Sequence, residues 1–202
     1  MAKKLESTFA NMVIVLTAVS LVAAISLASV YNLTKAPIAK AKLKKKLDAI
    51  ANVAPAFDNN PNAEMFKLPA FDPSPGMDSL EIYPAKKEGK IVGYAVKTYT
   101  MKGFSGLIEL MVGFKPDGTI NNYSVLAHAE TPGLGTKMLS WFKNEKKPKR
   151  CINGKNPKNI NLTVSKDGGD IDAITAATIS SRAFLDAVNR AYKTLEQGGK
   201  YE

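Results

Sequence analysis

The sequence predicts an α+β fold, in which a single N-terminal transmembrane helix precedes one domain built from an antiparallel sheet and packed helices. Three patterns support this prediction. Residues 9–33 carry no charged side chain, strand-like segments joined by short turns occupy much of residues 80–126, and an amphipathic helical pattern closes the chain. The 202 residues include 45% hydrophobic and 23% charged side chains, which is typical of a folded protein rather than a disordered one.

The first feature after a short tail at residues 1–8 is the uncharged segment from residue 9 to residue 33. A helix of about 20 apolar residues spans the hydrocarbon core of a bilayer, and Tyr31 could lie at its far interface. A cleaved signal peptide is the alternative, because Ala28 and its neighbours are small. The apolar region of a signal peptide has only about 7–15 residues, so we expect an uncleaved anchor.

Residues 34–78 are predicted to form a lysine-rich amphipathic helix and a connector. The helix is expected over residues 36–54, with one apolar stripe made of Ile38, Leu43, Leu47, Ile50 and Val53. Its cations are Lys35, Lys40, Lys42, Lys44, Lys45 and Lys46. Contact with anionic lipid and packing on the following domain both remain open. Residues 55–78 are rich in Pro, Asn and Asp and are interpreted as an irregular connector.

The remaining domain, residues 79–202, begins with an antiparallel meander. Its strands are expected at residues 80–84, 91–100, 107–114 and 120–126, with a turn at Pro116-Asp117-Gly118. A short helix is expected around residues 138–142. The last helix should bury a face made of Ile179, Ala183, Phe184, Ala187, Val188, Ala191 and Leu195, and Gly198-Gly199 should end it.

The charge and the scarcity of metal ligands limit the classes of function. The net charge is +10, and basic residues also cluster between Lys143 and Arg150. No aromatic side chains interleave with these clusters, so we expect a solvated lysine-rich surface and no nucleic-acid partner. A single cysteine, Cys151, excludes an internal disulfide and a multi-cysteine cluster, and a single histidine, His128, excludes a multi-histidine metal site. Any electron carrier must therefore be organic or come from a partner.

The segment from Asp172 to Ser180 carries the clearest chemical pattern. It leads from a loop into the last helix, and hydroxyl side chains recur at residues 175, 178, 180 and 181. The first turn of a helix offers free N–H groups and a positive dipole end, which favour a phosphate. An ordinary helix cap by Thr175 or Thr178 is the alternative that spacing alone favours.

The order Asp172, Thr175, Ala176, Ala177, Thr178 resembles the flavinylation motif of the FMN-binding domain family. The resemblance implies that a flavin transferase moves FMN from FAD onto the hydroxyl of Thr178 as a phosphoester. It also implies that Asp172 helps the transferase place its metal and its substrate. Ala176 departs from the usual glycine, and we expect alanine to exclude any conformation with positive φ.

Two further segments also resemble that family. In the segment His128–Gly135, Glu130 and Thr131 can supply polar contacts, while Gly133, Leu134 and Gly135 could bring the backbone close to a flat ring. The segment Gly103-Phe104-Ser105-Gly106 also fits the family's pattern. Lys166 could offset phosphate charge, with a solvated surface lysine as the alternative. His128 is expected to be a structural, hydrogen-bonding histidine, and no stable metal site is expected at Asp167, Asp170 and Asp172.

Over nearly its whole length the chain resembles the G subunits of the Rnf electron-transport complex. The resemblance implies an electron-relay protein, rather than an enzyme in its own right, that carries covalent FMN. Its complex couples electron flow between ferredoxin and NAD to ion transport. The implied partners are the other Rnf subunits, the flavin transferase and membrane lipid. The related C subunit of sodium-pumping NADH:quinone reductase and a membrane-anchored module without covalent flavin remain alternatives, as does a basic membrane-tethered structural or nucleic-acid-binding protein.

The side of the membrane is a point on which two arguments conflict. Six lysines follow the apolar segment, between residues 35 and 46, whereas only Lys3 and Lys4 precede it and Glu6 offsets them. By the positive-inside rule, this difference would keep the large domain in the cytoplasm. The resemblance implies the extracytoplasmic side of the inner or plasma membrane. We follow the resemblance.

Overall fold

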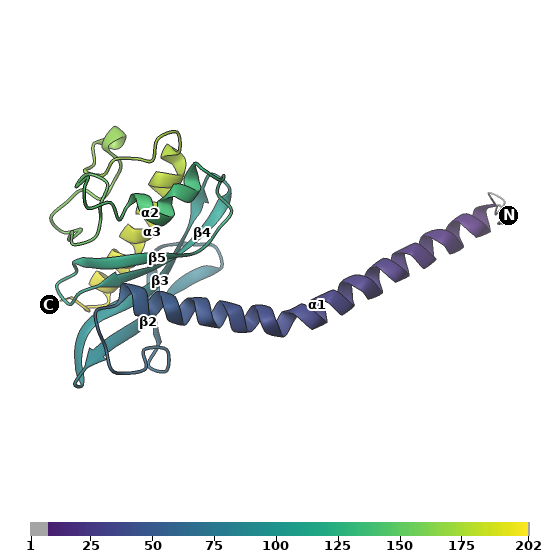
Figure 1. Cartoon of the computed structure of the whole chain (residues 1–202), viewed down its shortest axis with the longest axis horizontal. Helices are drawn as coiled ribbons and strands as arrows, with labels where there is room; N and C mark the ends of the chain where they lie inside the picture. The colour runs from purple at the N-terminus through teal and green to yellow at the C-terminus, as the bar shows by residue number, and fades with distance from the viewer. Residues whose placement is uncertain (1–7, 202) are drawn as a thin grey trace. The chain divides into compact units, whose positions relative to one another are not determined.

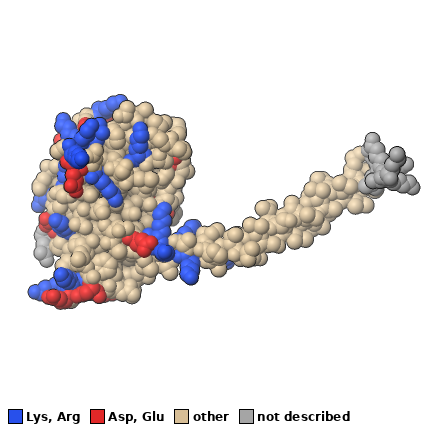
Figure 2. All heavy atoms as spheres, in the orientation of Figure 1, with Lys and Arg blue, Asp and Glu red and all other residues tan. Residues whose placement is uncertain are grey.

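The computed structural model describes residues 8–201, so Lys3, Lys4 and Glu6 in the short N-terminal tail lie outside the described residues. The chain divides into two compact units, residues 1–44 and residues 45–202. Helix α1 (Phe9–Val53) begins in the first unit and ends in the second. Its apolar part is long and hydrophobic enough to cross a membrane, and Figure 2 shows it without charged atoms. Residues 9–33 alone would extend about 37 Å along a helix, against about 30 Å of hydrocarbon.

The lysine-rich segment differs from the helix expected over residues 36–54. It continues the anchor as one helix that runs through Pro37, because nothing in Thr34-Lys35-Ala36 ends a helix. The expected buried stripe is also only partly correct. Ile50 and Val53 are buried, whereas Ile38, Leu43 and Leu47 are exposed.

The second unit is built on a five-stranded antiparallel sheet with the strand order β1-β2-β3-β4-β5 (Figure 1). The strands are β1 (Phe66–Ser74), β2 (Met77–Lys87), β3 (Lys90–Gly103), β4 (Gly106–Phe114) and β5 (Ile120–His128). The four strands expected from alternation and turn residues are confirmed as β2 to β5. Each is hydrogen-bonded to its neighbour in sequence, as expected of a meander.

Strand β1 corrects the interpretation of residues 55–78 as an irregular connector. Residues 66–69 pair with residues 79–82 of β2, and the register then shifts before Ser74. Pro69 lies within this strand. A proline cannot donate to a central ladder but is tolerated at the edge of a sheet, which is where β1 lies. The prolines that suggest a connector are therefore compatible with an edge strand.

The sheet has a buried cluster on each face. One face packs against α3 (Thr178–Gln197), where Phe184 stacks on Phe142 with ring centroids 4.4 Å apart. The other face, with Tyr83 and Met111, packs against the end of α1. Gly113 permits this second contact, since a Cβ at that position would lie 1.9 Å from the carbonyl oxygen of Val53.

The expected C-terminal helix is confirmed as α3, with one correction to its buried face. Six of its seven expected core residues are buried, but Ile179 is 48% exposed. Ile179 instead lines a surface hollow described below, although Ser180 and Ser181 in the same turn are buried. The short helix α2 (Met138–Trp141) follows a single 3₁₀ turn, η1 (Gly135–Lys137).

Candidate functional site

Three segments far apart in the sequence meet around a hollow of about 310 Å³ at the start of α3. They are the β3–β4 turn, the loop after β5, and the residues that enter α3. The lining consists of Phe104, Thr131, Leu134, Gly135, Ala176, Ala177, Thr178, Ile179 and Ser180. These are the three segments that carry the family resemblance, and the fold brings them to one place.

Thr178 is the first residue of α3 and lines this hollow. The preceding residue, Ala177, occupies the N-cap position, and no side chain caps the helix. The interpretation of Thr175 or Thr178 as an ordinary helix cap is therefore wrong. Ser181 is the first residue of α3 whose N–H bonds to a carbonyl, that of Ala177 at 3.0 Å. Among the described residues, no acceptor is found for the N–H groups of Thr178, Ile179 and Ser180, so these donors can bind an anion.

Ala176, the position where the family motif usually has glycine, has φ = +61°. The expectation that alanine would exclude a positive φ is wrong. The chain enters α3 through a left-handed residue, which costs an L-amino acid with a Cβ about 1–2 kcal/mol. The motif's usual glycine thus has a local explanation, and this chain bears the strain of alanine.

Glu130 lies beneath the hollow rather than in its wall. It is 4% exposed, and its Oε1 accepts a hydrogen bond from the Ser105 N–H at 3.0 Å. Its Oε2 accepts a hydrogen bond from the Ser180 hydroxyl. One carboxylate therefore joins the β3–β4 turn, the loop after β5 and the first turn of α3. Gly135 fits over this junction, where a Cβ would lie 2.7 Å from both Glu130 Oε2 and Ser180 Oγ.

The other expected site residues divide into two groups. Thr131, Leu134, Gly135 and Ala177 line the hollow together with Thr178. The residues outside its lining are Gly133, Lys166, Asp172 and Thr175.

The four expected site residues outside the lining are exposed, form a turn or bond to neighbouring side chains. Thr175 and Lys166 are exposed, and Gly133 makes a turn with φ = +74°. The Asp172 carboxylate accepts a hydrogen bond from the Ser165 hydroxyl at 2.9 Å. His128 has a structural role, since its Nδ1 accepts the N–H of Glu130 at 3.2 Å.

The residues around the hollow fit a flat aromatic ring on a phosphate arm. Phe104 is 66% exposed, and with Leu134 and Ile179 it gives the hollow an apolar rim beside the Thr178 hydroxyl. Sequence reasoning did not assign Phe104 or Ile179 to the site individually. The sequence feature that could have indicated them is a large apolar residue at an irregular position. Phe104 lies in a turn bounded by glycines, and Ile179 lies at a helix start.

A larger groove of about 680 Å³ runs along α3 and shares Ile179 with the hollow. Most of its charged side chains are engaged in ion pairs, such as Arg182 with Asp167 at 2.7 Å and Lys102 with Asp186 at 2.7 Å. The groove does not include Thr178. The smaller hollow is therefore the better candidate for a flavin attached to that residue.

The residues that line the hollow lie within a segment that matches a known family. Residues 103–193 match the FMN-binding domain family. The chain is 32% identical to the G subunit of the ion-translocating oxidoreductase complex of Vibrio cholerae serotype O1 (strain M66-2) over 174 residues, which cover 83% of this chain and 80% of that protein. The corresponding protein of Haemophilus influenzae (strain PittEE) is 34% identical over 185 residues, covering 88% and 86%.

Among solved structures, the crystal structure of Shewanella oneidensis NqrC is similar with a TM-score of 0.43 and 21% identity, over 60% of this chain and 63% of that one. That likeness is too weak to support an argument, whereas the identity to the G subunits extends over most of both chains. The chain therefore belongs to the family formed by the G subunits of ion-translocating oxidoreductase complexes.

Proposed function

We propose that this protein is a membrane-anchored flavoprotein that relays electrons within an ion-translocating oxidoreductase complex through FMN bound covalently to Thr178. The carrying observation is the position of Thr178, whose hydroxyl lies at an uncapped helix start and beside an apolar hollow. FMN supplies one- or two-electron transfer when it is bound. The protein's part is to hold the group in place and to shape its surroundings.

The attachment reaction that we propose is a transfer from FAD. The Thr178 Oγ1 attacks the phosphorus on the FMN side of the FAD pyrophosphate, and the bond from that phosphorus to the oxygen of AMP breaks. AMP leaves, and the hydroxyl proton is released to a base of the transferase. The N–H groups of Ile179 and Ser180 can then bind the phosphoester oxygens, and Phe104, Leu134 and Ile179 can cover the ring.

The remaining parts of the proposal concern the site and its setting. Glu130 holds the walls of the hollow, and Thr131, Leu134, Gly135 and Ala177 line it. Asp172, Thr175, Gly133 and Lys166 then belong to the surface that the flavin transferase meets, since they lie outside the lining. We place the domain on the extracytoplasmic side of the membrane, with the exposed lysines of α1 near lipid headgroups. A reporter fused after Glu202 tests that side, and activity confined to the cytoplasm would reverse it.

Intact mass spectrometry of the purified chain tests the covalent bond. Protein from its native host, or made together with a flavin transferase, should carry an excess mass of one FMN less one water. Thr178→Ala should lack this mass and show no fluorescent band in a denaturing gel. Thr178→Ser should keep part of the modification, because the hydroxyl remains.

The matched control for this test is Thr175→Ala, which removes the exposed threonine three residues earlier. After long incubation it should reach the full adduct, because the Thr178 hydroxyl remains, whereas its initial rate can fall because Thr175 lies on the proposed transferase surface. If Thr178→Ala keeps the flavin while Thr175→Ala, or a variant at Ser180 or Ser181, loses it, the assigned acceptor is wrong. A wild-type chain that binds flavin but releases it on denaturation would support a non-covalent site instead.

A further inference from the structure

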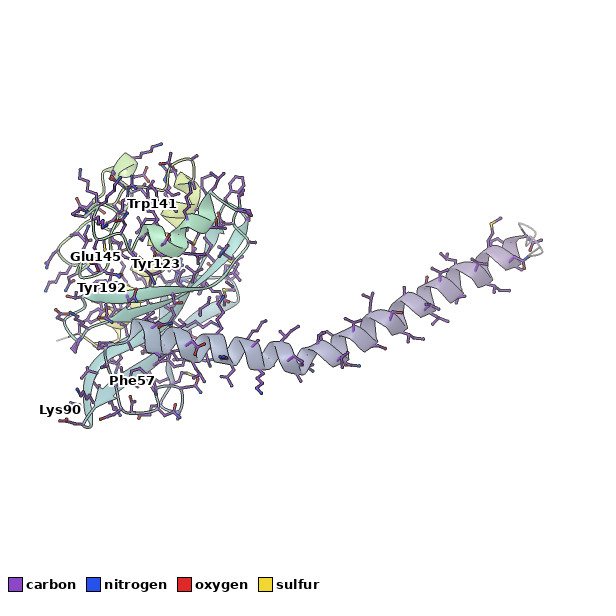
Figure 3. The ribbon with its side chains drawn as sticks, viewed as in Figure 1. Phe57, Lys90, Tyr123, Trp141, Glu145 and Tyr192 are labelled. Atoms are coloured by element: carbon purple, nitrogen blue, oxygen red, sulfur yellow. The ribbon has the colours of Figure 1, made fainter. Side chains whose placement is uncertain are left out.

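The loop between α2 and α3 contains the most concentrated positive charge of the domain. Residues 143–158 hold seven basic side chains and one carboxylate, Glu145, for a net charge of +6. We use the name basic lobe for Lys143–Arg150, the first half of this segment. Figure 2 shows lysine and arginine gathered over the part of the domain where Figure 3 labels Trp141 and Glu145.

The basic lobe is fixed to the beginning of the flavinylation motif. The N–H of Asp172 donates to the carbonyl of Lys149 at 2.7 Å, and the Trp141 indole donates to the carbonyl of Asp172 at 3.0 Å. The Arg150 guanidinium lies over the Trp141 ring, 3.9 Å from its centroid. The lobe is thus joined to the motif through its backbone and through a packed aromatic side chain.

Within this lobe, the ammonium groups of Lys146, Lys147 and Lys149 are available to a partner. All three residues are exposed, and the part of the chain that the structure describes gives them no ion pair. Lys143 differs, because its ammonium lies over the Tyr123 ring, 4.6 Å from the centroid. The three exposed lysines therefore form an uncompensated positive surface beside the motif.

We propose that this surface docks an acidic face of the flavin transferase during FMN attachment. This inference rests on the proposed function. Thr178 must enter the transferase's active site, and six residues of chain place it at most about 20 Å from Asp172. The turn closed by the Ala177 N–H and the Ile174 carbonyl at 3.0 Å shortens that span. A typical interface buries about 800 Å² per partner, or a disc about 30 Å across, so a protein that covers both ends of the motif also covers the lobe.

The position of the lobe beside the motif selects the transferase over an electron-transfer partner as the occupant. Electron transfer requires an approach to the flavin but no contact with Asp172, whereas group transfer requires the motif itself to be held in a fixed geometry. Exposed charges beside such a site mainly raise the association rate, and their effect falls as salt screens them. The lobe should therefore act on the rate of docking rather than on the chemical step.

The test is the initial rate of flavinylation of the full-length chain by a flavin transferase with FAD and Mg²⁺, at substrate concentrations well below saturation. The lobe variant is Lys146→Glu, Lys147→Glu, Lys149→Glu. The control variant is Lys67→Glu, Lys87→Glu, Lys90→Glu, which makes the same change in net charge at exposed lysines on β1 and the β2–β3 turn. Figure 3 shows Lys90 at the opposite end of the domain from Trp141.

We expect the lobe variant to be modified about tenfold more slowly than wild type at about 0.03 M salt. The two rates should converge near 1 M salt, where the Debye length is about 3 Å. The control variant should follow wild type throughout. Thermal unfolding of all three chains verifies that each is folded, and the final yield of adduct should be equal after long incubation.

Equal rates for the lobe and control variants at low salt overturn this inference alone, provided that the wild-type chain is modified. The same conclusion follows if the lobe variant loses binding to anionic lipid vesicles but keeps its rate, because the lobe then serves a membrane surface. A wild-type chain that takes up no flavin overturns the proposed function, and this inference with it.

Discussion

Thr178 and Ala176 determine the local geometry at the start of α3. Thr178 supplies a hydroxyl at a helix start that no side chain caps, and Ala176 turns the backbone with φ = +61° just before it. The motif could be found in the sequence as a pattern. The left-handed turn could not, because a positive φ at an alanine opposes the residue's own preference and is imposed by the surrounding fold.

Replacing Ala176 by glycine should stabilise the protein. Glycine adopts a positive φ without steric cost, which should gain about 1–2 kcal/mol, but its greater freedom in the unfolded chain offsets about 0.5–1 kcal/mol of this. We therefore expect the free energy of unfolding to rise by about 0.5–1 kcal/mol, as measured by urea denaturation.

The neighbouring Ala177→Gly is the matched control for this substitution. Ala177 has φ = −138° and is buried, so the same change there should lower stability. If both glycine variants are equally destabilised, Ala176 is not strained in the folded protein.

At the level of elements, a strand or helix could be predicted from the sequence wherever its local pattern agrees with its environment in the folded protein. Strands β2 to β5 alternate and are bounded by turn residues, so they could be predicted. Strand β1 could not, because Pro69 and its polar neighbours have the composition of a loop and only pairing with β2 makes them a strand. The prediction that Ile179 is buried was wrong because helical periodicity alone cannot show that this residue lines a surface hollow.

A buried ionic cluster joins α3 to the edge of the sheet. Arg190 is 3% exposed, and it donates hydrogen bonds to the carbonyls of Phe71, Asp72 and Tyr99. Asp186, one turn earlier in α3, accepts from Arg190 at 3.1 Å and from Lys102 at 2.7 Å. Burial alone would raise the pKa of Asp186, but hydrogen bonds from Lys102 and Thr100 and the charge of Arg190 outweigh it, so this pKa is lowered.

This cluster should make the domain sensitive to acid. A lowered pKa in the folded state means that the ionised Asp186 stabilises the fold at pH values above the unfolded pKa of about 3.9. That contribution is lost as the pH falls through the folded-state pKa. Asp186→Asn should cost about 3 kcal/mol at pH 7, because Arg190 loses its close carboxylate partner while remaining buried.

Urea denaturation between neutral pH and about pH 3 measures this effect. The stability difference between wild type and Asp186→Asn should shrink as the pH falls below about 3.9. Asp78→Asn is the control, at an exposed carboxylate for which the described residues show neither a hydrogen bond nor an ion pair. A difference between wild type and Asp186→Asn that is constant with pH would show that ionisation of Asp186 does not stabilise the fold.

At the scale of the whole molecule, the segment suited to a bilayer and the residues that form the buried clusters of the domain lie in different units of the chain. The first unit, residues 1–44, contains the segment suited to a bilayer. Both buried clusters of the sheet are made from residues of the second unit, and one of them includes Ala49, Ile50 and Val53 at the end of α1. The last part of a helix whose first part is long and apolar enough to cross a membrane is therefore also a structural part of the domain.

Two truncations should separate these roles. A chain of residues 45–202 keeps every member of both clusters, so it should fold and remain in solution without detergent. A chain of residues 55–202 loses Ile50 and Val53 and uncovers the sheet face that carries Tyr83 and Met111. Burial of an Ile or Val side chain contributes about 1.5–3 kcal/mol, so these two alone account for about 3–6 kcal/mol of a typical total of about 5–15 kcal/mol.

Circular dichroism and urea denaturation should show a cooperative transition for the longer chain and a weak or absent one for the shorter. Equal stability of the two chains would mean that the end of α1 is dispensable to the domain.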